Sequence, residues 1–164
     1  MPSLDERAVV MCGISGSGKT VFSQRLEREG YTRISADELV WQKYGDSFTE
    51  LSPQCQREVY MTVNAEVIAT AKEALSHGQR IVVDATMCKR AGRDKMVPAC
   101  REAGVEPVFV YLPTPYEVLA QRLAGRTGHG PNDQIVTQEQ LRQYYANFEV
   151  PANDENFIIP DECK

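Results

Sequence analysis

Short runs of apolar and β-branched residues alternate along the chain with longer segments in which apolar residues recur every three or four positions. The first run is Ala8-Val9-Val10-Met11-Cys12, and further runs follow at 31–34, 80–84, 107–112 and 157–159, the last fitting an edge strand. The continuously apolar runs are typical of strands buried on both faces, as in a parallel sheet. The pattern predicts an α/β protein with a central parallel sheet of about five strands.

The segments between these runs have the pattern of crossover helices. The longest should begin at Ser52-Pro53 and end at Gly78, with one apolar stripe at four-residue intervals: Val59, Val63, Val67, Ala71 and Leu75. Other helices are expected around Phe22 and Leu26, over 89–103, from about 115 to 126, and after a capping box at 137–140. Helices on both faces of the sheet would give three layers.

Directly after the first apolar run comes Gly13-Ile14-Ser15-Gly16-Ser17-Gly18-Lys19-Thr20, which matches the phosphate-loop pattern G-x-x-x-x-G-K-[ST]. Glycines let successive backbone N–H groups turn inward, and the positive end of the next helix points at the same anion. A glycine-rich turn that binds nothing is the alternative, and the strand-loop-helix context argues against it. The residues assigned to the nucleotide are Gly13, Ser15, Gly16, Ser17, Gly18, Lys19 and Thr20, with the Thr20 hydroxyl as a Mg²⁺ ligand.

Two aspartates follow expected strands. Asp37 could accept the proton of an attacking hydroxyl, although Ser35 and Asp37 could equally cap the next helix. Asp84 closes the run 80–84, a position suited to an acceptor or to a Mg²⁺-bound water; the alternative is a turn residue that satisfies local N–H groups. Parallel sheets bind ligands at the carboxyl ends of their strands, which favours a functional role for Asp84.

Arg122 and Arg126 are four residues apart and are expected on one helical face. They lead into Thr127-Gly128-His129-Gly130-Pro131-Asn132-Asp133, whose composition predicts a mobile loop. We call residues 122–136 the lid segment. Guanidinium groups on a lid could clamp phosphoryl oxygens in the transition state, whereas a solvated helix face is the plain alternative.

The 164 residues include 42% hydrophobic and 25% charged residues, and the net charge is −5. These values fit one globular domain over 1–164 and give no support for extended binding to nucleic acid. The one notable basic cluster consists of Lys89, Arg90, Arg93 and Lys95. Five cysteines without a C-x-x-C pair favour reduced thiols. The polar stretch 1–7 does not fit a signal peptide, and no apolar run is long enough for a membrane span, so a cytoplasmic protein is expected.

With these residues in place, the chain resembles the kinase domain of phage-type polynucleotide 5′-kinases and related small P-loop kinases, over about residues 8–154. The shared features are the phosphate loop, Asp37, Asp84-Ala85-Thr86, the lid sequence 121–128, and the run 141–151. The resemblance implies a P-loop kinase fold that uses ATP and Mg²⁺ to phosphorylate a hydroxyl acceptor. It further implies Lys19, Arg122 and Arg126 on the donor phosphates, Asp37 as general base, Asp84 near the acceptor or metal, and Phe148–Pro151 near the adenine.

Two positions depart from that family pattern. Val40 stands where the phage-type enzymes have an arginine that grips the acceptor's phosphate, and Met87 stands where asparagine is common. The leading hypothesis is a kinase for nucleic-acid 5′-hydroxyls. The alternatives are a kinase for a small hydroxylated molecule or nucleoside, which Val40 and the acidic net charge favour, and a non-catalytic nucleotide-binding module. The oligomeric state does not follow from the sequence.

Overall fold

The computed structural model describes residues 6–164, so most of the polar stretch 1–7 lies outside the described residues. Its centre is one sheet with the strand order β2-β3-β1-β4-β5, in which all neighbouring strands are parallel. The strands are β1 Ala8–Cys12, β2 Thr32–Ser35, β3 Ile81–Asp84, β4 Val108–Tyr111 and β5 Phe157–Ile158. The predicted five-stranded parallel α/β fold is confirmed, with β5 at one edge.

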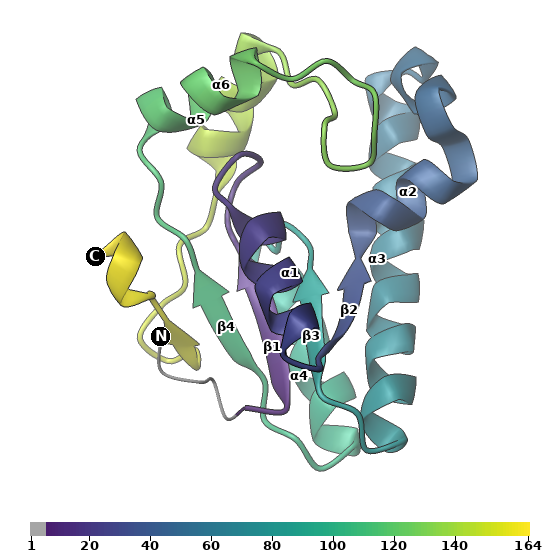
Figure 1. Cartoon of the computed structure of the whole chain (residues 1–164), viewed down its shortest axis with the longest axis vertical. Coiled ribbons are helices and arrows are strands. Elements are labelled where there is room, and N and C mark those ends of the chain that lie inside the picture. Colours follow the sequence, from purple (N-terminus) through teal and green to yellow (C-terminus); the bar gives the residue numbers. More distant parts are fainter. Residues whose placement is uncertain (1–5) are drawn as a thin grey trace.

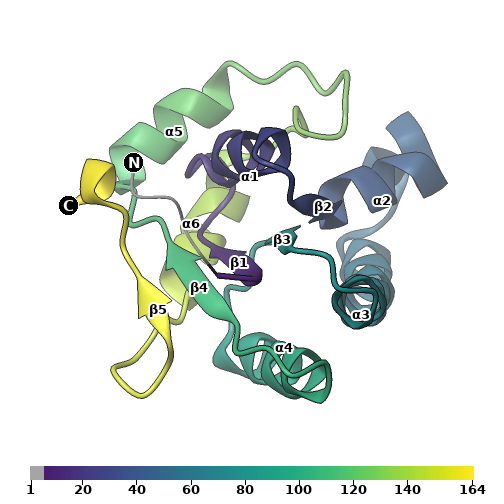
Figure 2. The ribbon, with the colours of Figure 1, turned by 60° about the horizontal axis from the view of Figure 1, so that its bottom comes forward.

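Helices cover both faces of the sheet, which gives the three layers expected (Figure 2). The helices are α1 Lys19–Arg28, α2 Ala36–Tyr44, α3 Pro53–Ser76, α4 Arg90–Glu102, α5 Tyr116–Ala124 and α6 Gln138–Asn147, with short 3₁₀ helices η1 Gly45–Glu50 and η2 Asp161–Cys163. In the part of the chain that the structure describes, no helix is both long and apolar enough to cross a membrane.

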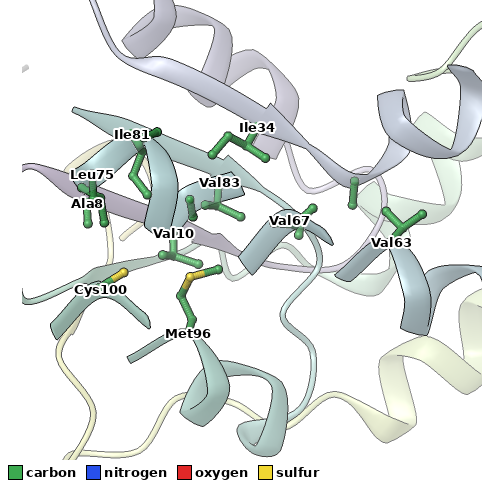
Figure 3. Close-up of a cluster of buried hydrophobic side chains, with 14 of the residues drawn as sticks. Ala8, Val10, Ile34, Val63, Val67, Leu75, Ile81, Val83, Met96 and Cys100 are labelled. Atoms are coloured by element: carbon green, nitrogen blue, oxygen red, sulfur yellow. The ribbon is translucent and has the colours of Figure 1, made fainter. Parts of the chain in front are cut away.

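The two faces of the sheet have separate cores because successive side chains of a strand point to opposite faces. Val9 and Met11 of β1 pack with Phe22 of α1. Val10 points to the opposite face, where it packs with Val67 of α3 and Met96 of α4 (Figure 3). Burial of the central strand on both sides explains its uninterrupted apolar sequence.

Local capping agrees with the sequence at two helices and corrects it at a third. The Ser52 side chain accepts a hydrogen bond from the N–H of Cys55 at the start of α3, and Thr137 forms the expected capping box at α6. The helix expected to reach Arg126 instead ends at Ala124, with Gly125 as its C-cap. Glycine has a low helix propensity, and the N–H of Arg126 closes a tighter turn onto the carbonyl of Leu123.

Candidate active site

The phosphate loop lies between the carboxyl end of β1 and the first turn of α1, below the lid segment (Figure 1). Gly18 is the N-cap of α1 at φ 100°, a left-handed conformation that favours glycine, and no side chain caps the helix. The first N–H groups of α1 therefore remain available for an anion. The buried Ser17 Oγ has no hydrogen-bond partner, and an orphaned buried hydroxyl is unusual unless a ligand completes it.

Close packing inside the loop requires a glycine at position 13. A Cβ on Gly13 would lie 2.6 Å from Ser17 Oγ and 3.3 Å from Ser17 Cβ, so a larger residue would displace the Ser17 side chain. The Gly13 N–H donates to the carbonyl of Thr86 at 3.1 Å, which ties the phosphate loop to the segment after β3. Ser15, another loop residue assigned to the nucleotide, is partly exposed.

The Lys19 ammonium lies within the phosphate loop and donates to the carbonyl of Ile14 at 3.1 Å. Burial lowers the pKa of Lys19, while the Asp84 and Asp37 carboxylates oppose this effect and Arg126 adds to it. Lys19, Asp37, Asp84 and Arg126 thus interact electrostatically as one cluster. Phosphate groups entering this cluster would supply the negative charge that the ammonium lacks.

Asp84 lies at the carboxyl end of β3, where an ion pair holds it. Its Oδ2 accepts from Arg33 Nη2 at 2.7 Å and from Ser23 Oγ at 3.0 Å, and the Asp84 and Arg33 side chains are 5% and 4% exposed. The turn interpretation, in which Asp84 would satisfy local N–H groups, does not describe these contacts. Asp84 instead joins β3 to β2 and α1, next to Lys19.

Asp37 lies in the first turn of α2, and the capping function falls to Ser35, whose side chain accepts from the N–H of Glu38 at 3.3 Å. The Asp37 carboxylate is thereby free to bond elsewhere, and the Tyr60 hydroxyl lies 2.7 Å from its Oδ1. Burial raises the pKa of Asp37, and the Tyr60 hydrogen bond and the charge of Lys19 act in the opposite direction. A carboxylate with a raised pKa is a stronger proton acceptor than a solvated one.

Arg122 and Arg126 reach different parts of the site, because only Arg122 lies within α5. Exposed Arg122 donates from Nη1 to the carbonyl of Gly16, a residue of the phosphate loop, at 2.9 Å. Arg126 follows the helix end and donates from Nη1 to the carbonyl of Gln134 at 3.1 Å, within electrostatic range of Lys19 and Asp37. The expectation that both arginines share one helical face is therefore wrong for Arg126.

The lid segment beyond Arg126 turns back on itself around Asp133. The carboxylate of Asp133 accepts from the N–H and hydroxyl of Thr127 and from the N–H of His129. The Thr127 hydrogen bonds lower the pKa of Asp133. In Figure 1 this segment passes above the carboxyl ends of the strands, from the α5–α6 side toward α3.

A pocket of about 390 Å³ opens beside the phosphate loop on the β4 side. Tyr111 and Phe148 stack there with ring centroids 5.7 Å apart and an interplanar angle of 16°. The lining residues are Ile14, Ser17, Tyr111, Leu112, Pro113, Thr114, Pro115, Leu119, Tyr145, Phe148 and Val150. Pro151, which the resemblance assigns to the nucleotide, is buried and lies outside this lining, whereas Phe148 and Val150 from the same run line the pocket.

Met87 has φ 48°, a left-handed conformation that asparagine tolerates better than methionine does. This preference gives a physical reason for the asparagine that the family pattern favours at this position. The carbonyl of Met87 accepts from Arg93 Nη1 at 2.9 Å, and Arg93 forms a two-pronged ion pair with Glu155, with Nε–Oε1 at 2.6 Å and Nη2–Oε2 at 3.1 Å. The Arg93 and Glu155 side chains are 1% and 5% exposed, so a buried ion pair holds the loop 84–87 in place.

Replacing Glu155 by glutamine should lower the free energy of unfolding by about 3 kcal/mol, because it leaves the buried Arg93 guanidinium without a countercharge. Urea unfolding followed by circular dichroism measures the loss. Glu106→Gln is the matched control, because Glu106 pairs with Arg101 on the surface, where ion pairs contribute little. Equal urea midpoints for the two variants would contradict the prediction.

Sequence reasoning missed Tyr60, Arg33 and Gln134. Tyr60 is partly buried on α3, three residues before Val63 of the buried stripe. A hydroxyl group beside a buried stripe needs a hydrogen-bond partner, and this was the available signal. Arg33 is a charged residue within a strand, which usually marks a specific partner. No pattern in the sequence singles out Gln134.

The parallel sheet order, the phosphate loop between β1 and α1, and the overlying lid segment define a P-loop kinase fold. A family model described as an AAA domain matches residues 9–151. The chain belongs to this family.

Three relatives illustrate the breadth of the group. The chain is 25% identical over 170 residues to a "Probable gluconokinase" of Xenopus tropicalis, covering 95% of this chain and 85% of the relative. A gluconokinase structure from Sinorhizobium meliloti 1021 matches with 24% identity and a TM-score of 0.63, covering 93% of this chain and 80% of that one. A chain of the Pnkp1/Rnl/Hen1 RNA repair complex matches with 22% identity and a TM-score of 0.63, covering 85% of this chain and 43% of that one. The likeness to the two structures concerns the fold. Together with the family membership, the name of the Xenopus relative indicates a phosphotransferase.

Proposed function

We propose that this protein is an ATP- and Mg²⁺-dependent kinase that phosphorylates a hydroxyl group of a small polyhydroxylated molecule. The observation that carries the proposal is the cluster in which the Asp37 carboxylate lies within electrostatic range of Lys19 and Arg126, at the edge of the phosphate loop. A proton acceptor beside phosphate-binding cations is the arrangement that phosphoryl transfer requires.

The donor side of the proposal rests on the phosphate loop and its neighbours. The unpartnered Ser17 hydroxyl and the uncapped N-terminus of α1 fit a polyphosphate, and the pocket around Tyr111 and Phe148 offers aromatic surface for the base. Lys19, Arg122 and Arg126 would contact the phosphates of ATP.

Mg²⁺ would be held by the Thr20 hydroxyl together with oxygens of the bound nucleotide. Residues 6–164 contain no group of three or more His, Cys, Asp or Glu side chains arranged for a metal, which fits a cation held largely by substrate phosphates. When bound, Mg²⁺ neutralises charge on the phosphates.

On the acceptor side, Asp37 would orient the attacking hydroxyl and take its proton. The hydroxyl oxygen forms a bond to the γ-phosphorus, the bond from that phosphorus to the bridging oxygen breaks, and ADP leaves. Because Oδ1 of Asp37 is engaged by Tyr60, the other carboxylate oxygen would receive the proton. Lys19 and Arg126 would stabilise the negative charge that develops on the transferred group.

The charges around the acceptor side favour a small molecule over a nucleic-acid end. Val40 is fully buried in the core between α2 and α3, so this position presents nothing to an acceptor phosphate. Three of the four residues in the basic cluster after Asp84 pair with carboxylates: Lys89 with Glu149, Arg90 with Asp94 and Asp154, and Arg93 with Glu155. The Glu149 carboxylate also accepts from the N–H of Arg90, the first residue of α4. This carboxylate therefore occupies the N-terminal end of α4, where an anion would otherwise bind.

A screen of acceptors coupled to ADP release and confirmed with γ-labelled ATP tests the proposal. The panel contains neutral sugars and polyols, sugar acids, nucleosides, and a 5′-hydroxyl oligonucleotide. We expect transfer to one of the small molecules and none to the oligonucleotide. Preferred transfer to the oligonucleotide would instead support the polynucleotide kinase hypothesis. ATP binding without transfer to any acceptor would support a non-catalytic nucleotide-binding module.

A further inference from the structure

Tyr60 of α3 links the Asp37 carboxylate to the lid segment. Its hydroxyl lies 2.7 Å from Oδ1 of Asp37 and 3.2 Å from Oε1 of Gln134. The ring is fixed from the other side by Phe48, which meets it edge-on at a centroid distance of 5.6 Å and an angle of 88°. The hydroxyl therefore has a defined position between two oxygen acceptors from different parts of the chain.

A phenol carries only one proton, so these two oxygens compete for the same donor. The shorter contact is to Asp37, whose negative charge strengthens the hydrogen bond. The Gln134 oxygen, when close, draws part of this donation away from the carboxylate. The position of Gln134 therefore affects how strongly Tyr60 stabilises the ionised form of Asp37.

Gln134 also contacts Arg126, the lid-segment arginine assigned to the ATP phosphates. The main-chain carbonyl of Gln134 accepts a hydrogen bond from Arg126 Nη1 at 3.1 Å. Gln134 thus touches both Arg126 and Tyr60, the residue that bonds to Asp37. Movement of the lid segment at this point would change both contacts together.

We propose that Tyr60 is a positioning residue, which holds the Asp37 carboxylate for proton transfer and, through competition from Gln134, makes its basicity depend on the placement of the lid segment. The part of this inference that concerns catalysis rests on the proposed function. The geometric link between Tyr60, Asp37 and Gln134 does not.

Other charged or titratable groups also face Asp37, one from each neighbouring element. They are Lys19 of α1, Asp84 at the end of β3, Arg126 of the lid segment and Tyr144 of α6. Tyr60→Phe removes only a hydroxyl, and Gln134→Ala removes an uncharged side chain, so neither substitution alters this set of charges. The two variants should therefore report on the shared proton.

The expected signature is a pair of opposite shifts in the pKa of Asp37, measured by carbon NMR of labelled aspartate carboxyl groups in the nucleotide-free protein. Tyr60→Phe removes the donor and should raise the pKa of Asp37 above that of the wild type. Gln134→Ala removes the competing acceptor and should lower it. Asp37→Asn identifies the resonance.

Matched controls are Tyr44→Phe and Gln143→Ala. Tyr44 packs against the same Phe48, and Gln143 bonds to Glu139 on the outer side of α6. Neither control should move the Asp37 resonance. A shift of the same sign in Tyr60→Phe and Gln134→Ala, or no shift in either, would overturn the proposal, because a purely structural role predicts no opposition.

Kinetics then separates failure of this inference from failure of the proposed function. In an active kinase, the acid limb of kcat should move upward in pH in Tyr60→Phe and downward in Gln134→Ala, with kcat of Tyr60→Phe reduced on the order of tenfold. Opposite NMR shifts in a protein that phosphorylates no acceptor would support the link and reject the kinase function. An active kinase whose acid limb is unmoved in both variants would reject the catalytic part of the link.

Discussion

Replacing Asp37 by asparagine is expected to lower kcat by about 10²- to 10⁴-fold, the usual contribution of a positioned general base. Asparagine has nearly the same shape as aspartate but cannot accept the proton of the attacking hydroxyl. The affinity for ATP should stay nearly unchanged, because Lys19 and the backbone of the phosphate loop remain. Initial rates with the acceptor identified by the screen, together with calorimetric binding of ATP, measure the two quantities separately.

Unfolding cannot account for such a loss of rate, and the sign of the pKa shift explains why. Burial raises the pKa of Asp37 in the folded protein, so folding disfavours its ionised form, and this cost is present at pH values above the folded pKa. Asparagine carries no charge and escapes this cost. The melting temperature of Asp37→Asn should therefore equal or exceed that of the wild type near neutral pH.

The same shift sets the expected pH dependence of the wild-type enzyme. Only the ionised carboxylate can accept a proton, so the rate should fall as the pH drops through the raised pKa, at a higher pH than an ordinary aspartate would give. The acid limb should be absent from the residual activity of Asp37→Asn. If Asp37→Asn kept more than a tenth of the wild-type kcat, Asp37 would be ruled out as the base.

The architecture was predictable because burial on both faces of a parallel sheet has a direct sequence signature. The apolar runs at β1 and β3 indicate strands that are buried on both faces. The apolar residues at four-residue intervals in α3 indicate which side of that helix is buried. The helix with a weak sequence signal is α2, which the sequence indicates only as the helix that Ser35 or Asp37 could cap. Two of its nine side chains, Ala36 and Val40, are buried. Nine residues make about two and a half helical turns, a window too short to define a helical period.

The site was predictable where chemistry depends on consecutive residues and less so where it depends on contacts across the fold. The phosphate loop is continuous in sequence, and Asp84 ends a strand next to it. Tyr60 and Gln134 lie 74 positions apart and meet only because the lid segment passes over the end of α3. The different directions of Arg122 and Arg126 likewise depend on where α5 ends.

That difference between the two arginines underlies the second large effect. Arg126→Ala should lower kcat by about 10³-fold, within the range for an arginine that stabilises a phosphoryl transition state. Its partly buried guanidinium lies within electrostatic range of both Lys19 and Asp37. Arg126→Lys should recover little of the rate, because an ammonium cannot form the two-pronged contact of a guanidinium.

Arg122→Ala is the matched comparison, since it removes the same kind of side chain four residues earlier in the chain. Arg122 is exposed and bonds to the carbonyl of Gly16 in the phosphate loop. Its loss should therefore act mainly on the KM for ATP, with kcat reduced far less than in Arg126→Ala. Steady-state kinetics of both variants at saturating acceptor decides the matter. Equal losses of kcat would mean that closure of the lid segment brings both guanidinium groups onto the transferred phosphate, and a larger loss in Arg122→Ala would reverse the assignment.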